Sequence, residues 1–231
     1  MTYLELVQRL RQETNYANTG PTSVAGQSGD HARAVSWVAD AYTEIQNRHP
    51  WRWLRKEFTL TTSASVDTYD FTSALDGGVA ISRFKSWHFG DIYNPPKSYL
   101  ESAGVGSESR MLFVPWAYFR SIYRIGSQPT GAPRFITIDP NDNIVVGPKP
   151  DAAYVITGEY NRSAQVLSDN DDVPEMPSDY HMLIVYQAME DFGLYDAATE
   201  ILSRSRTKGR RLMRQLEGTQ MPKMRMTGPM A

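Results

Sequence analysis

The hydrophobic positions at the start of the chain recur at helical spacing in two stretches. Thr2 and Glu5 have the spacing of a capping box, and the pattern behind them predicts a helix that ends before residues 14–29. A second helix is predicted with Asp30 as its N-cap and Pro50 as its end. The segment between them is rich in Gly, Ser, Thr and Asn, so we expect a long irregular loop with a function of its own.

The period of the pattern changes to two near residue 57. Two β-branched and aromatic runs, 57–62 and 66–71, are separated by a Ser-Ala-Ser turn, and this arrangement predicts a β-hairpin. A short helix is predicted at 115–125. The other predicted strands are 81–89, 110–114, 134–139, 143–146 and 154–160. The count favours a small antiparallel sheet or barrel of about six strands.

Helical spacing returns after the Asp- and Pro-containing turn that ends at residue 177. Ser178 is the expected N-cap of a helix that is apolar nearly all round and therefore buried, with Gly193 as its end. Asp196 is expected to open a last helix that fades at Gly218. Residues 218–231 hold two Pro, two Gly and four Met without a period, so this tail alone has little reason to fold.

Together these elements predict an α+β fold. Residues 1–56 and 163–217 are expected to form an antiparallel helix bundle, which is interrupted by a small antiparallel β domain at 57–162. Residues 218–231 are expected to form an extended C-terminal arm. With 231 residues, 41% of them hydrophobic, the chain can bury one sizeable core or two small ones.

The composition excludes several classes of function but does not itself indicate one. The net charge of −2 does not indicate nucleic acid or membrane as the partner of the whole surface. The chain has no Cys, which excludes a disulfide framework and a Cys nucleophile and fits a reducing cytoplasm. No apolar run approaches the roughly 18 residues of a membrane span, and no signal peptide is visible, so we expect a soluble protein.

Each enzyme signature in the sequence lacks an essential part. The four His are far apart, Gly104 and Gly106 lack the third Gly of a dinucleotide loop, and Ser205 with Lys208 lacks the partners of an SxxK nucleophile. The acids near Asp171 suggest a calcium loop, but Tyr180 occupies the bidentate position. We therefore expect no cofactor, no metal site and no catalytic residue, although an enzyme acting through unrecognised carboxylates stays open.

The charges near the C-terminus are strongly segregated. Residues 165–200 contain nine Asp or Glu and no Lys or Arg, whereas residues 203–231 contain eight Lys or Arg and one acid, Glu217, a net charge of 8 − 1 = +7. Three interpretations are open: a solvated helix face neutralised within one molecule, a nucleic-acid contact, or a protein interface. Nucleic acid ranks below the other two because the basic stretch has no interleaved aromatic residues for stacking.

The interface interpretation gives a set of candidate partner-binding residues. A basic helix that leads into a Met-containing arm combines long-range attraction with adaptable thioether packing. The candidates are Arg204, Arg206, Lys208, Arg210, Arg211, Arg214, Met221, Lys223, Met224, Arg225 and Met226.

Several short motifs, taken in their order along the chain, resemble the head–tail adaptor (connector) proteins of tailed bacteriophages. They are Gly20-Pro21-Thr22-Ser23-Val24, Gly26-Gln27-Ser28-Gly29, Trp37-Val38, Ala41, Glu44-Ile45-Gln46, Trp51 to Leu54, Asp172-Val173-Pro174, Met176-Pro177, Tyr180-His181 and Tyr186-Gln187-Ala188. The resemblance covers both ends of the predicted helical body, whereas residues 57–160 are similar only in texture.

The resemblance implies a non-enzymatic structural subunit of the virion. Such adaptors form a ring, expected to be dodecameric, beneath the portal ring, grip the portal with a C-terminal arm, and present their other face to the tail or nozzle protein. Phage DNA passes through such a ring without sequence-specific contact, and assembly takes place in the host cytoplasm. The alternatives are another virion ring protein, such as a tail terminator or a tail-tube-associated protein, and a phage hydrolase or nuclease.

A ring needs two different surfaces that complement each other on neighbouring subunits. The acidic 165–200 block facing a neighbour's basic 203–214 stretch is one candidate for this contact.

Overall fold

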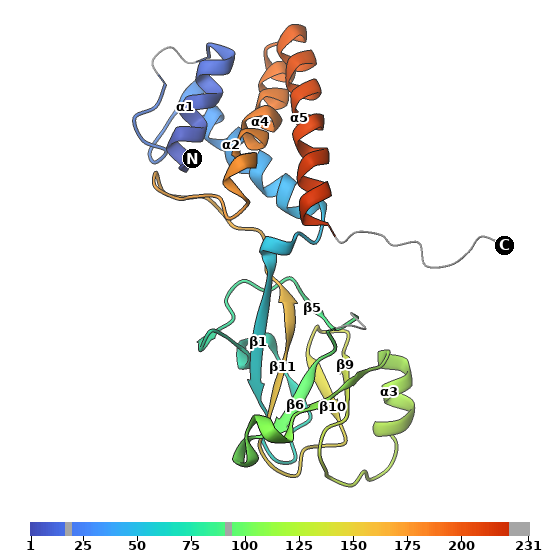
Figure 1. Cartoon of the computed structure of the whole chain (residues 1–231). Helices are drawn as coiled ribbons and strands as arrows, with labels where there is room; N and C mark the ends of the chain where they lie inside the picture. The colour runs from blue at the N-terminus through green and yellow to red at the C-terminus, as the bar shows by residue number, and fades with distance from the viewer. Residues whose placement is uncertain (17–19, 91–93, 222–231) are drawn as a thin grey trace, which may run out of the picture. The chain divides into compact units, whose positions relative to one another are not determined.

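The computed structural model describes residues 1–16, 20–90 and 94–221, and the chain divides into two compact units (Figure 1). One unit comprises Met1–Leu54 together with Ala164–Ala231, and the other comprises Arg55–Ser163. The first is helical and the second is mostly β, so the predicted α+β class is confirmed, with five α-helices and mostly antiparallel strand pairing in the described residues.

The helical unit is built around one central helix. Its helices are α1 (Tyr3–Thr14), α2 (Gly29–Arg48), α4 (His181–Tyr195) and α5 (Thr199–Gln220). α4 packs against each of the other three and, as its all-round apolar sequence predicts, most of its residues are buried. The shared core includes Leu6, Val38, Tyr42, Ile184 and Leu216.

Local hydrogen bonds fix the ends of the first two helices. The predicted capping box is confirmed: Glu5 donates its backbone N–H to the Thr2 hydroxyl at 3.3 Å, and Thr2 donates its own to the Glu5 carboxylate at 2.9 Å. α2 ends at Arg48, close to the predicted end. The fully buried Trp51 donates its indole N–H to the Ile45 carbonyl at 2.7 Å and so satisfies one of the carbonyls that the helix end leaves unpaired.

Two predicted N-caps are wrong by a few residues. Asp30 lies inside the first turn of α2, and Ser28 holds the N-cap position. Ser178 begins a short 3₁₀ helix, Ser178–Tyr180, and Tyr180 is the N-cap of α4. In both places the predicted cap is a residue whose side chain could cap a helix and which lies near the helix start. The helix nevertheless begins a few residues away from it.

The predicted boundary between α4 and α5 is also wrong. Gly193 lies inside α4, which continues to Tyr195, and Asp196 follows the end of α4 rather than opening α5. Gly193 is needed for close packing, because a Cβ built there would lie 2.7 Å from Cγ of Leu202 in α5. α5 continues through Gly218 to Gln220, so residues 218–220 are helical, and the rest of the predicted arm beyond Met221 lies outside the described residues.

The described residues of the β unit form a seven-stranded and a four-stranded sheet. In the first, the strand order is β4-β3-β1-β11-β6-β7 and β5 also pairs with β11; in the second, it is β2-β10-β9-β8. The first comprises β1 (Arg55–Thr61), β3 (Leu75–Asp76), β4 (Val79–Ala80), β5 (Ser86–His88), β6 (Lys97–Leu100), β7 (Ser109–Arg110) and β11 (Tyr154–Asn161). The second comprises β2 (Thr68–Tyr69), β8 (Leu112–Phe113), β9 (Phe135–Ile138) and β10 (Ile144–Gly147).

The predicted hairpin between 57–62 and 66–71 is wrong. β1 pairs along its full length with β11, from Arg55 opposite Asn161 to Thr61 opposite Val155, whereas β2 pairs with β10 in the other sheet. In the described residues, the strands therefore form two sheets instead of the one small antiparallel sheet or barrel that the sequence predicted. β8 pairs with β9 in parallel. The predicted short helix is confirmed as α3 (Trp116–Tyr123), whose Phe119 is buried against the second sheet.

Candidate partner-binding surfaces

α5 is attached to the helical unit by a narrow stripe. Its buried residues, Ser205, Gly209, Met213 and Leu216, recur every three or four positions and so lie on one side of the helix. That side packs against α4. Half-buried residues such as Ile201 and Leu212 flank the stripe, and the predicted basic residues of this 22-residue helix are all exposed.

Three of the candidate cations on α5 contact their own chain. Arg204 forms an ion pair with Glu13 of α1, and the Arg206 guanidinium lies 3.5 Å from the Glu190 carboxylate of α4. The Lys208 ammonium lies over an aromatic ring of α4, 5.5 Å from the ring centroid. For Arg204 and Arg206, neutralisation within one molecule accounts for part of the charge segregation.

The other three candidate cations, Arg210, Arg211 and Arg214, are exposed and form no ion pair with any residue that the structure describes. We call these three residues the α5 outer face. Arg210 and Arg214 also line a groove of about 310 Å³ between α2, α4 and α5, with Leu183 and Met213 among its apolar lining. This face therefore carries positive charge that the folded unit leaves unpaired.

The candidate residues of the arm divide at the end of α5. Met221 is half-buried and packs against the helical core. Lys223, Met224, Arg225 and Met226 lie outside the described residues.

The acidic block is not one surface. In the loop before α4, the Asp172 carboxylate accepts the backbone N–H groups of Ser168 at 2.6 Å and Asp169 at 2.8 Å, and these hydrogen bonds lower its pKa. This carboxylate closes a turn. Within the described part of the chain, no three His, Asp or Glu side chains converge in a way that could hold a metal ion.

A second group of acids gathers on α2 and α4. Asp191 of α4 is half-buried, and burial together with the nearby carboxylates of Glu44, Asp40 and Glu190 raises its pKa. We call Asp40, Glu44 and Asp191 the α2/α4 acidic surface. Our sequence analysis found Asp191 in the acidic block but missed Asp40 and Glu44, which are distant in sequence and lie on a helix of mixed charge.

α3 presents an apolar stripe to solvent. Tyr118 and Ile122 lie one turn apart on α3 and are 55% and 38% exposed, and Ile125, just beyond the end of the helix, is 62% exposed. The surrounding sequence is basic, since residues 109–138 contain four Arg and no acid. Contiguous exposed apolar surface of this kind is typical of a protein-contact site.

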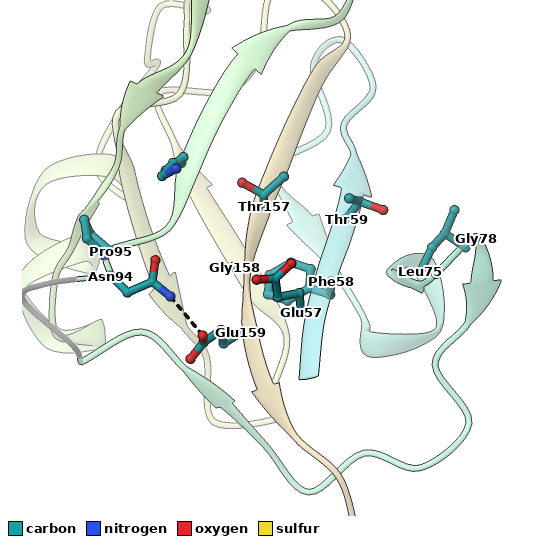
Figure 2. Close-up of a pocket in the computed structure, with 12 residues that line it drawn as sticks. Glu57, Phe58, Thr59, Leu75, Gly78, Asn94, Pro95, Thr157, Gly158 and Glu159 are labelled. Carbon is teal, nitrogen blue, oxygen red and sulfur yellow. Dashed lines mark hydrogen bonds between the residues drawn. The ribbon is translucent and has the colours of Figure 1, made fainter. Parts of the chain in front are cut away.

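A hollow of about 480 Å³ lies on the seven-stranded sheet, above β1 and β11 (Figure 2). Glu57 and Glu159 are register partners on its floor. Asn94 donates its amide to the Glu159 carboxylate at 2.9 Å, as Figure 2 shows, and Arg55 lies 3.6 Å from the same carboxylate. Directly opposed like charges destabilise a sheet, and Arg55 offsets that repulsion.

The described lining of the hollow does not contain a Ser–His or Cys–His pair. Its described lining contains Thr, Asn, Lys and Glu but no Ser, Cys or His that could serve as a conventional nucleophile and base pair. Glu159 is already bound by Asn94 and Arg55. The arrangement therefore supports sheet pairing rather than catalysis.

Comparison with known proteins identifies the family of the chain. The model of the SU10 adaptor protein family matches residues 1–230. The chain belongs to the SU10 adaptor protein family. No curated protein matches the chain.

Membership of the SU10 adaptor family confirms the resemblance to phage head–tail adaptors that the sequence motifs indicated. An SU10 adaptor is a structural protein of the phage virion, of a kind that is generally not an enzyme, and its family implies portal and tail proteins as general partners. In the described residues, no helix is both long and apolar enough to cross a membrane.

Proposed function

We propose that this SU10 adaptor forms a dodecameric ring beneath the portal of a tailed phage, docks the tail or nozzle, and surrounds part of the DNA exit channel. The observation that carries the proposal is the family match across residues 1–230, which includes both structural units. The unpaired cations of the α5 outer face support a further protein contact. The helical unit serves in this proposal as an antiparallel bundle that carries the ring contacts.

The portal contact is assigned to the end of α5 and the residues that follow it. Residues 222–231 contain Lys223 and Arg225, three Met and no acid. Long-range attraction followed by thioether packing suits docking of such a segment into a groove of another protein.

Deletion of residues 222–231 tests this assignment. The cut leaves α5 and the packed Met221 intact, so the shortened chain should keep the circular dichroism spectrum and the melting temperature of the full chain while losing portal binding in co-sedimentation. A matched control replaces the segment by a Gly/Ser sequence of equal length, which should also fail to bind. Portal binding that survives both changes would contradict the assignment.

The same experiment separates the adaptor from the rival virion parts. A tail terminator or tail-tube-associated protein shares a ring but has no portal-gripping segment. If the full chain binds tail protein and never binds portal, the rival is correct.

The tail or nozzle contact is assigned to the apolar stripe of α3. The stripe is the exposed apolar helix side of the β unit, and it has basic surroundings and no cover within the described residues. An adaptor needs a second partner surface besides the one that binds the portal, and an exposed apolar stripe suits that role.

A further inference from the structure

The α5 outer face is an unpartnered helix surface. Arg210, Arg211 and Arg214 are exposed over the second half of α5, and no acid of the described residues forms an ion pair with them. The acids close to α5 have other partners: Glu13 pairs with Arg204, Glu190 pairs with Arg206, and the Glu217 carboxylate lies 3.1 Å from His49. The positive charge of this face is therefore available to another molecule.

The same unit carries a complementary surface on different helices. Asp40 and Glu44 are exposed on α2, and Asp191 lies beside them on α4. Gln187 donates its amide to Glu44 at 3.3 Å, but no Lys or Arg of the described chain forms an ion pair with any of the three. Like charges held close together repel each other, and cations supplied by a partner would relieve that repulsion.

The two surfaces do not pair with each other within one subunit. α5 and α2 both pack against α4, and Arg210 and Arg214 line a groove that also includes Arg48 of α2, but no ion pair in the described residues joins them to Asp40, Glu44 or Asp191. Two different complementary surfaces on one subunit make a heterologous contact, which generates a closed ring when the rotation between subunits is suitable.

We propose that the α5 outer face of one subunit binds the α2/α4 acidic surface of the neighbouring subunit. The proposal rests on the proposed ring and names its contact. It also changes the contact expected from the sequence, because the acidic partner includes Asp40 and Glu44 and leaves out the turn-closing Asp172. The occupant is a second copy because the complementary negative charge, with no cation of its own chain paired to it in the described residues, is present on the same subunit. A single strand of nucleic acid would also need stacking residues, which α5 lacks.

Reciprocal charge reversal tests the contact. One variant carries Arg210→Glu and Arg211→Glu, and the other carries Asp40→Lys and Glu44→Lys. Each alone places like charges across the interface, so self-association in sedimentation, and ring filling on the portal in native mass spectrometry, should weaken about tenfold or more. An equimolar mixture of the two restores opposite charges at every contact and should recover assembly.

A matched control reverses two acids of the block that lie outside the acidic surface. Asp171→Lys with Asp179→Lys changes the net charge by the same amount as Asp40→Lys with Glu44→Lys. Both control positions are exposed on the helical unit, and this variant should assemble as the natural chain does. Portal binding by the C-terminal residues is measured for every variant, so a loss of assembly is not confused with a loss of portal recognition.

Three results would overturn the contact. The first is that either charge-reversed variant fills the portal ring as completely as the natural chain. The second is that the equimolar mixture assembles as weakly as either variant alone. Binding of double-stranded DNA that Arg210→Glu and Arg211→Glu abolish, with assembly intact, would assign the face to phosphate. A natural chain that never binds portal would instead contradict the proposed function.

Discussion

His181 is a buried titratable residue that the adaptor surfaces do not use. It is 2% exposed at the start of α4, and its Nε2 lies 3.1 Å from the Met176 carbonyl. Burial lowers its pKa from the ordinary value of 6.5, so the folded protein holds the imidazole neutral. The Met176 carbonyl accepts the hydrogen bond in that state.

This depressed pKa predicts how stability depends on pH. The unfolded chain takes up the His181 proton at higher pH than the folded chain, so the free energy of unfolding should fall as pH drops below about 6.5. His181→Gln stays neutral and can keep the donor to Met176, so it should flatten the dependence. Urea unfolding at pH 7.5 and 5.5 measures it, and an equal pH dependence in both proteins would contradict the prediction.

Two Gly of the last helices should respond oppositely to substitution. Gly193→Val introduces atoms where even a Cβ would lie 2.7 Å from Leu202 Cγ, and it should lower the free energy of unfolding by about 1–3 kcal/mol. Gly218→Ala is the matched control, because nothing lies within 4 Å of its Cβ position in α5, and it should raise stability by up to about 1 kcal/mol. Urea denaturation with an unchanged slope checks both, and a destabilising Gly218→Ala or a neutral Gly193→Val would contradict the packing described.

These two Gly also show where sequence reasoning fails at this scale. Thr2 and Glu5 identified their helix start correctly because a capping box is a local interaction. Gly193 looks like a helix end in sequence, yet it allows another helix to approach. That role depends on Leu202, which lies next to Gly193 only because α4 packs against α5.

At the scale of elements, α3 is the part of the β unit best suited to partner binding. Tyr118→Asp places a charge in the exposed apolar stripe and should weaken binding to the tail or nozzle protein about tenfold or more. Ala117→Asp adds the same charge to the same exposed turn outside the stripe and should bind normally. Surface plasmon resonance compares the two variants at equal melting temperature, and equal affinities would remove the stripe from the tail contact.

The strands show which elements a single sequence can locate. Runs of β-branched and aromatic residues placed β1, β9, β10 and β11 within one or two residues, because each run supplies several buried side chains. The very short strands β3 and β4, and the four-residue β6, were missed. Pairing was wrong for β1, whose partner β11 is distant in sequence, since periodicity says which side of a strand is buried and not which strand lies beside it.

The whole molecule contains a β unit whose two ends meet. Arg55 begins β1, Asn161 ends β11, and the two are register partners. The unit has its own buried cores, including Phe58, Trp87 and Ile156. This topology is expected of a domain inserted into a helical body.

Residues 55–163 alone should therefore fold. They should give a cooperative thermal transition and dispersed amide resonances. Residues 55–150 lack β11, which pairs with β1, β5 and β6, and should remain unfolded. A non-cooperative transition in the 55–163 fragment would show that the β unit depends on the rest of the chain.

Part of the candidate site could also be predicted from sequence. The basic stretch on α5 was visible because its six cations fall within one helix. The sequence did not show that three of these cations contact their own chain while the three of the α5 outer face do not. Glu13 and Glu190 reach α5 only through tertiary packing. Asp40 and Glu44 were missed because they come close to Asp191 only through the packing of α2 against α4.

The central claim is that this SU10 adaptor joins the portal as a ring, and the mass of the complex tests it most directly. Purified protein is mixed with its cognate portal and analysed by native mass spectrometry, beside each component alone. The proposed role predicts a complex with one adaptor chain for each portal chain, in which the adaptor forms a closed ring. A stable monomer or dimer whose mass does not change in the presence of portal would contradict it.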